Sequence, residues 1–229
     1  MLLSGTVRRS SLPLSQLYGP IDDSYRNARV WRFVSLAEPT LLDRPKIQEA
    51  FRLMGQYLLD RKALGEIVVY GGSAILLQFD WRRLSMDVDA RIVSAASHGL
   101  VIEAMHDAAK RLQLPSSWLN ESVTMYARRG EESADRVFIG TYPSAGRVGL
   151  RVMAAKPEYI LAMKLAALER ATGDDRDYLD AINLGAVCGV TTAEGLRDIF
   201  RKYFAEATLP FRAELRLRDL ADAIKAKLS

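Results

Sequence analysis

The sequence predicts an α+β fold, a small mixed β-sheet with helices, followed by a helical C-terminal half. Short runs rich in β-branched residues, typical of strands, occur between residues 66 and 154 and alternate with segments that have the apolar spacing of helices. Beyond residue 156 only helical spacing recurs. We therefore divide the 229-residue chain into an N-terminal extension (1–44), a mixed core (45–155) and a helical C-terminal subdomain (156–229).

The composition is that of a globular protein and excludes several classes. Hydrophobic residues make up 49% of the chain and charged residues 26%, which argues against a disordered or collagen-like protein. The single cysteine, Cys188, cannot form an internal disulfide, and no apolar run is long enough to span a bilayer. We expect a cytoplasmic protein without a membrane partner. The net charge of +4 is compatible with nucleic-acid contact but does not establish it.

The first half of the core alternates helices and strands. Apolar residues recur at helical spacing from Ile47 to Leu58, with Pro45 suited to the first turn and Gly65 to the exit. The elements expected next are a strand over Glu66–Tyr70, a helix from about Ser73 to Phe79, a strand over Met86–Val93, a helix over Leu100–Leu112 and a less regular segment around Trp118–Tyr126.

The second half begins with two strands and continues with helices. Pro143 and Gly146 favour a turn between strands at Arg136–Thr141 and Val148–Ala154. The expected helices run from Pro157 to about Arg170, closing near Gly173, from Asp175 to about Val187, from a capping box at Thr191 and Glu194 to Phe204, and from about Phe211 to Lys227.

Two carboxylates on one strand form the first candidate site. Side chains alternate along a strand, so Asp87 and Asp89 point to the same face and Val88 to the other. Their mutual repulsion is relieved by a divalent cation, and carboxylate oxygens suit Mg²⁺ when it also holds substrate phosphates. The alternative interpretation is a polar strand edge that faces solvent.

A glycine pair forms the second candidate site. Gly71 and Gly72 lie where a strand leads into a helix, so backbone amides there can approach a phosphate, and Ser73 can add a hydroxyl donor. Arg82 and Arg83 follow shortly after. The alternative is an ordinary tight turn. Together with the aspartate pair, the pattern indicates a site for a triphosphate and a metal ion.

These residues resemble a known signature. Gly71-Gly72-Ser73, then Arg82 or Arg83, Ser85, Asp87 and Asp89, are similar to the Gly-Gly-Ser/Thr and Arg-x-Ser/Thr-x-Asp-x-Asp motifs of the DNA polymerase beta-type nucleotidyltransferase superfamily. The segments Ala155–Ala166 and Arg176–Asp180 resemble its AbiEii/AbiGii toxin-like branch. The resemblance implies a nucleotidyltransferase core that moves a nucleoside monophosphate from a Mg²⁺-bound NTP to an acceptor hydroxyl. It also implies RNA, at the 3′ end of tRNA, as acceptor and a cognate antitoxin as partner.

Three charged residues in the helical half complete the expected site. Lys164 shares a helix face with apolar residues, where a charge is costly unless something negative meets it. A lysine whose ammonium reaches solvent is the alternative. The resemblance implies that Lys164 neutralises the triphosphate, and that Asp177 and Asp180 belong to the family's nucleotide-binding segment. The alternative interpretation of Asp177 and Asp180 is that they lie exposed in the acidic first turn of a helix, where the helix dipole stabilises them.

The sequence departs from the superfamily in one respect. Many members carry a third catalytic carboxylate on a later strand, whereas Val148–Ala154 contains no acid and offers Arg151 instead. Asp177 or Asp180 could substitute, the acceptor could lose its proton without a protein base, or catalysis could be lost. The alternatives are therefore a non-catalytic nucleotide- or partner-binding regulator, and an enzyme that modifies a small molecule or a protein.

Overall fold

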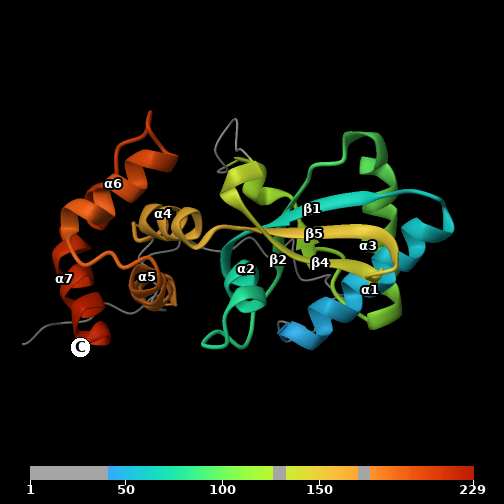
Figure 1. Cartoon of the computed structure of the whole chain (residues 1–229), viewed down its shortest axis with the longest axis horizontal. Helices are drawn as coiled ribbons and strands as arrows, with labels where there is room; N and C mark the ends of the chain where they lie inside the picture. The colour runs from blue at the N-terminus through green and yellow to red at the C-terminus, as the bar shows by residue number, and fades with distance from the viewer. Residues whose placement is uncertain (1–40, 126–132, 170–175) are drawn as a thin grey trace, which may run out of the picture. The chain divides into compact units, whose positions relative to one another are not determined.

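The computed structural model describes residues 41–125, 133–169 and 176–229, and every structural statement below concerns these residues. By its internal contacts the chain divides into Met1–Glu38 and Pro39–Ser229. The predicted extension, residues 1–44, thus lies almost wholly outside the described part. Within that part the fold is α+β, with one mixed five-stranded sheet (Figure 1).

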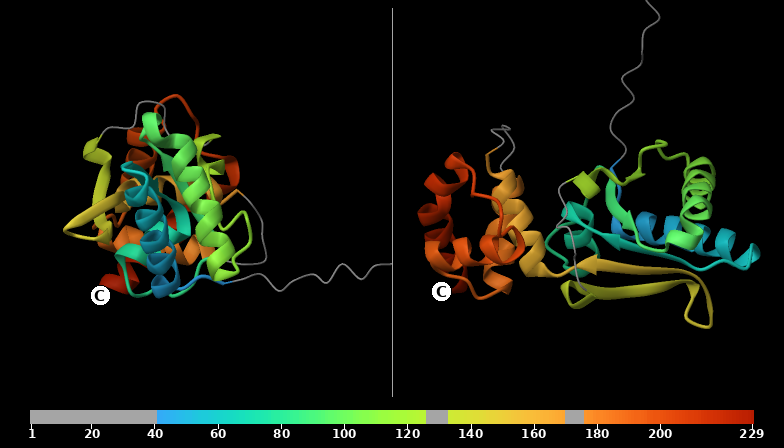
Figure 2. Two further views of the ribbon diagram at one scale, coloured as in Figure 1. Left: turned by 90° about the vertical axis from the view of Figure 1, so that its right-hand side faces the viewer. Right: turned by 90° about the horizontal axis from the view of Figure 1, so that it is seen from above.

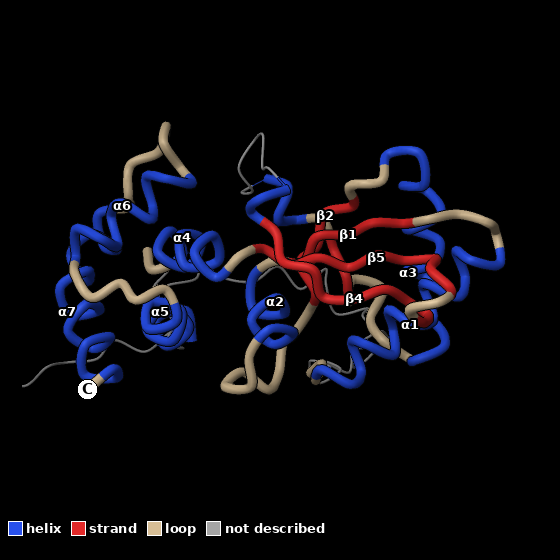
Figure 3. Tube along the Cα trace, in the orientation of Figure 1, coloured by secondary structure: helices blue, strands red, loops and turns tan. Residues whose placement is uncertain are grey.

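The sheet combines parallel and antiparallel pairs. Its strands, in the spatial order β3-β2-β1-β5-β4, are β1 (Gly65–Val69), β2 (Val88–Ile92), β3 (Leu119–Asn120), β4 (Arg136–Ser144) and β5 (Arg147–Ala155). The central strand β1 pairs antiparallel with β2 and parallel with β5, and the hairpin β4–β5 closes one edge (Figure 3). Because β1 and β5 are parallel, both run toward the end of the sheet where the helical half begins.

Helix α1 (Arg44–Asp60) covers one face of the sheet and contacts β4, β5 and α3 (His98–Leu112). Its N-terminus follows the expected pattern, since the Asp43 side chain accepts from the Lys46 amide and Pro45 occupies the first turn. The helix lies unusually close to β5, because a Cβ on Gly149 would be 2.0 Å from the Gly55 carbonyl oxygen. This glycine contact fixes the distance between helix and sheet.

Helix α2 (Gly71–Gln78) follows β1 directly and is held at both ends. At its N-terminus the Tyr70 amide donates to the Asp89 carbonyl, and at its C-terminus Arg44 donates to the carbonyls of Leu76 and Phe79. The start of α2 is therefore tied to β2, which carries the candidate carboxylates.

Four helices make up the rest of the described chain: α4 (Pro157–Ala167), α5 (Arg176–Val187), α6 (Ala193–Tyr203) and α7 (Phe211–Leu228). Helix α4 contacts α5, α6 and α7 on one side and α2 on the other, so it connects the helical half to the sheet (Figure 2). No helix of the described residues has both the length and the apolar character needed to cross a membrane.

Several boundaries differ from the prediction. Strand β2 starts at Val88, so Asp87 precedes it, and the irregular segment after Trp118 forms the short β3 and a 3₁₀ turn at Ser122–Met125. The prediction of a capping box at Thr191 is wrong, because the neighbouring Thr192 caps α6 and its side chain accepts from the Gly195 amide at 3.1 Å. Only Thr191 has a glutamate three positions later, so the capping-box spacing pointed to it, whereas Thr192 caps the helix through the Gly195 amide alone. Tyr126, Arg170, Gly173 and Asp175, expected at element ends, lie outside the described residues.

Candidate functional site

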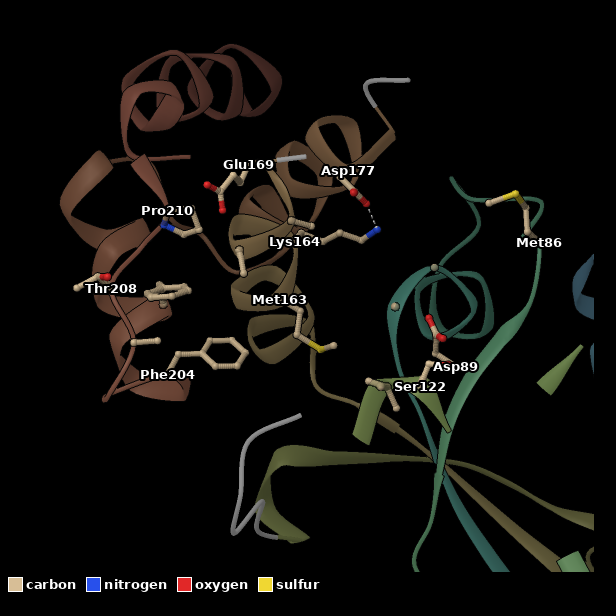
Figure 4. Close-up of a pocket in the computed structure, with 17 residues that line it drawn as sticks. Met86, Asp89, Ser122, Met163, Lys164, Glu169, Asp177, Phe204, Thr208 and Pro210 are labelled. Atoms are coloured by element: carbon tan, nitrogen blue, oxygen red, sulfur yellow. Dashed lines mark hydrogen bonds and ion pairs between the residues drawn. The ribbon is translucent and has the colours of Figure 1, made fainter. Parts of the chain in front are cut away.

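A cavity of about 810 Å³ opens where the sheet end meets the helical half (Figure 4). Its sheet side includes Gly71, Gly72 and Asp89, and its helical side includes Lys164, Asp177 and an apolar wall. Small-molecule sites typically have volumes of roughly 300–1,000 Å³. The cavity thus unites candidate residues that the sequence separates widely.

Gly71 and Asp89 meet at the start of α2. Gly71 has φ +60, a conformation that side chains disfavour, and a Cβ there would lie 3.0 Å from the Asp89 Oδ2 atom. The first amides of α2 have no partner within the helix, and the helix field favours negative charge there. A strand carboxylate and the N-terminus of a helix therefore lie next to each other.

Asp87 lies beside this point without lining the cavity. Its Oδ2 atom accepts from the Asn120 side-chain amide at 3.4 Å, and Asn120 is also the Cα partner of Asp89 across β2 and β3. No group of three or more His, Cys, Asp or Glu side chains among the described residues could hold a metal ion. Carboxylate oxygens are the ligand type that Mg²⁺ takes when phosphates and water complete its shell. Asp89 offers such a donor at the cavity, and Asp87 offers a second one outside its described lining.

Gly72 makes room for Arg82. A Cβ on Gly72 would lie 2.5 Å from the Arg82 Nη2 atom, so the guanidinium group lies directly over the backbone of the second glycine. Arg82 pairs in turn with Asp180 of α5, and the side chains are 15% and 7% exposed. The two glycines, which the sequence treats as one motif, thus serve different contacts.

Lys164 is buried, as the sequence indicated, and its negative partners belong to the protein. Its Nζ atom lies 2.5 Å from Asp177 Oδ1 and 2.9 Å from Asp180 Oδ2. Together with Arg82 this makes a cluster of two cations and two carboxylates that links α4, α5 and the α2–β2 loop. Figure 4 shows Lys164 and Asp177 between the two walls of the cavity.

Arg82 and Asp180, like Asp87, are not among the described residues that line the cavity, and the same holds for the predicted residues Ser73, Ser85 and Arg83. The Ser73 hydroxyl donates to the Tyr70 carbonyl at 3.1 Å and the residue is 1% exposed. Ser85 is also buried and pairs through its backbone with Leu42. Arg83 is exposed. In this geometry Ser73 and Ser85 support the local backbone rather than reach into the cavity.

The strand that lacks an acid uses Arg151 structurally. Arg151 forms an ion pair with Glu66, its Cα partner on β1. These side chains share a sheet face with Asp89. Glu66 and Val68 are two residues apart on β1, Val68 pairs with Arg91 of β2, and Arg91 is two residues from Asp89. Strand β5 contains no acid, so it supplies no third carboxylate, and Arg151 on this face is paired with Glu66.

Sequence reasoning missed the apolar wall of the cavity. It comprises Met163, Ala166 and Ala167 of α4, Phe200 of α6 and Phe204, Ala207 and Pro210 of the segment that follows α6. In the helix predicted to run to Phe204, the four-residue spacing puts Phe200 and Phe204 on one face. The same spacing is typical of residues in an ordinary hydrophobic core. Nothing in the sequence distinguishes these two interpretations.

Behind that wall, burial raises the pKa of Tyr203 to about 12, so its hydroxyl stays protonated at neutral pH. Its O–H donates to Glu158 at 3.2 Å. Tyr203 therefore packs beside the cavity, stacked on Tyr159, with its hydroxyl bound to a carboxylate.

A scan against protein-family models and searches of curated proteins and of solved structures return no match for this chain.

Proposed function

We propose that the protein is a nucleotidyltransferase that moves a nucleoside monophosphate from a Mg²⁺-bound NTP to an acceptor hydroxyl and releases pyrophosphate. The observation that carries the proposal is the closeness of Asp89 to Gly71. A Cβ added to Gly71 would lie 3.0 Å from Asp89 Oδ2, and both residues line a cavity that Lys164 also lines. Metal-binding carboxylate, anion-binding helix start and buried ammonium are the parts that phosphoryl transfer requires.

On the sheet side, Asp89 and Asp87 would hold Mg²⁺. The ion supplies two effects, a lower pKa for the acceptor hydroxyl and compensation of the charge that develops at the α-phosphate. Asn120 positions Asp87 by donating to its Oδ2 atom. Because each part acts by position and electrostatics, replacing either aspartate removes most of the rate.

On the helical side, Lys164 and the first amides of α2 would hold the β- and γ-phosphates. An ammonium group has three donors, and Asp177 and Asp180 take two of them. The third remains for a phosphate oxygen, while the two carboxylates fix the direction of the side chain. Lys164 thus reaches the cavity in a preset orientation.

The proposed acceptor is RNA, the 3′ end of tRNA, with a cognate antitoxin as protein partner, as the motif resemblance implies. A protein or small-molecule acceptor uses the same chemistry, so the assay must leave the acceptor open. The non-catalytic alternative, a nucleotide-binding regulator, retains support from the acid-free β5 and the structural use of Arg151. Turnover separates these two candidates.

The decisive experiment compares Asp89→Asn with the wild type. Each α-³²P-labelled NTP is incubated with the protein, Mg²⁺ and total cellular RNA and protein, and incorporation is followed in separate RNA and protein fractions. We expect the variant to lose roughly 100-fold or more of the incorporation. Asp198→Asn, an exposed aspartate on α6 that forms an ion pair with Arg201, is the matched control and should behave as the wild type.

Equal incorporation by wild type and Asp89→Asn would refute the assignment of Asp89. Nucleotide binding by the wild type, without incorporation into either fraction and without turnover of added small molecules, would favour the binding regulator. Thermal melting of both variants establishes that each is folded.

A further inference from the structure

We infer that the apolar wall of the cavity is the nucleobase subsite, with the ring of Phe204 as its stacking surface. This inference rests on the proposed function for the identity of the ligand, a nucleoside triphosphate. The phosphate end of the cavity lies at Gly71 and Lys164, and the wall supplies the apolar end that a base requires.

The orientation of Phe204 is fixed from behind. Its ring centroid lies 5.3 Å from that of Phe200 and 6.1 Å from that of Tyr159, at interplanar angles of 32° and 55°. Phe200 is 3% exposed and Tyr159 is fully buried, whereas Phe204 is only partly buried and lines the cavity. An aromatic ring that is already packed against two other rings loses little conformational freedom when a flat ligand contacts its exposed part.

The chain connects this ring to the phosphate end through α4. Met163 and Lys164 are consecutive, and both line the cavity, so the base wall and the ammonium share one helix. In Figure 4 the Phe204 and Met163 side chains lie on the helical side, across the cavity from Asp89. A ligand with one flat apolar end and one anionic end that binds a metal ion, as a nucleotide has, matches these two parts of the lining.

Stacking on Phe204 predicts little discrimination among bases, since every base offers a π-face. The binding affinities of all four NTPs should depend on the Phe204 ring to a similar degree. Selection of one base would have to come from polar groups at the rim of the wall.

The test measures binding to the full-length protein by titration calorimetry with Mg²⁺. The probes are α,β-methylene ATP, whose α–β bridge resists transfer, and inorganic tripolyphosphate, which has no base. We expect Phe204→Leu to weaken nucleotide binding about fivefold or more and to leave tripolyphosphate binding unchanged. Phe204→Tyr, which keeps the ring, should bind nucleotide like the wild type.

Phe211→Leu is the matched control, because Phe211 is 74% exposed at the start of α7 and is not among the described residues that line the cavity. It should change neither affinity. Thermal melting shows whether the Phe204 variants are folded, and the tripolyphosphate affinity shows whether the phosphate end is intact.

The outcomes separate this inference from the proposed function. If the wild type transfers nucleotide and Phe204→Leu binds nucleotide with unaltered affinity, the base subsite is overturned and the proposed enzymatic function still stands. A raised acceptor KM without loss of nucleotide affinity would likewise overturn it, because the ring would then serve the acceptor. Ring-dependent nucleotide binding without transfer would support the subsite and refute the enzyme, and failure of both probes to bind would overturn both.

Discussion

The two sides of the cavity use the same residue type in opposite ways. On the helical side, Asp180 is buried and forms ion pairs with Arg82 and Lys164. On the sheet side, Asp89 is partly buried and its carboxylate lies at the cavity surface beside the start of α2. Asp180 thus joins parts of the chain, whereas Asp89 lines the cavity, where the proposed function gives it a metal ion to bind.

This difference predicts where each substitution will have its effect. A carboxylate that compensates two largely buried cations contributes to stability, because its loss leaves those charges without a partner in a medium of low polarity. A carboxylate at the surface of a cavity contributes mainly to binding and catalysis, and its loss usually changes stability little. Measurements of the free energy of unfolding and of nucleotide incorporation on the same variants therefore test this difference.

The largest stability effect is expected for Asp180→Asn. The substitution keeps the volume but removes the charge that Arg82 and Lys164 share, so the free energy of unfolding should fall by about 3 kcal/mol. Urea denaturation followed by circular dichroism measures it. Asp89→Asn is the matched comparison and should change the free energy of unfolding by less than about 1 kcal/mol. Equal losses in the two variants would contradict the division of roles.

Part of this cluster could be predicted from the sequence. Helical spacing places Lys164 on an apolar face, which already requires a negative partner, and Asp177 and Asp180 were singled out by motif. The pairing of Asp180 with Arg82 spans 98 positions, and no local pattern specifies it. Only the packing of α5 against α4 and of α4 against α2 brings the two together.

The glycine pair shows the same limit. Its place between a strand and a helix follows from local propensity, and φ +60 at Gly71 agrees with the need for glycine there. The separate reason for Gly72, the guanidinium group of Arg82 over its backbone, depends on a side chain ten positions later. Phe204 is a similar case, because core and cavity aromatics have the same periodicity.

A moderate stability effect is expected for Gly71→Ala. The positive φ disfavours any side chain, and the new Cβ would press on the Asp89 carboxylate, so the free energy of unfolding should fall by about 1–2 kcal/mol. Gly99→Ala is the matched control, since an added Cβ there meets nothing within 4 Å and Gly99 lies in the first turn of α3. That control should be neutral or stabilising by up to about 1 kcal/mol.

In Gly71→Ala, incorporation should also fall, because Asp89 must move away from the start of α2. A variant that loses stability but keeps full incorporation would show that the close approach of Asp89 to Gly71 serves the fold alone.

The smallest effect concerns Glu158, an exposed counterpart to the buried cluster. A hydrogen bond from Lys202, at 2.5 Å, is the main reason why the pKa of the Glu158 carboxyl is lowered from its ordinary value. A carboxyl whose pKa is lower in the folded state stabilises the protein above its unfolded pKa, about 4.3, and loses that contribution as the pH falls through the folded value. Both side chains are about half exposed, so screening limits the contribution to roughly 0.2–1 kcal/mol.

Glu158→Gln should therefore be less stable than the wild type at pH 7 by that small amount, and the difference should shrink toward pH 3. Lys202→Gln, which removes the other partner, should reproduce the same pH dependence. Urea denaturation at pH 7, 5 and 3 measures both variants. A difference that grows as the pH falls would reverse the sign and show that the ionised Glu158 destabilises the link between α4 and α6. Because this pair lies at the surface, the contrast with Asp180 then measures how much burial adds to an ion pair in this protein.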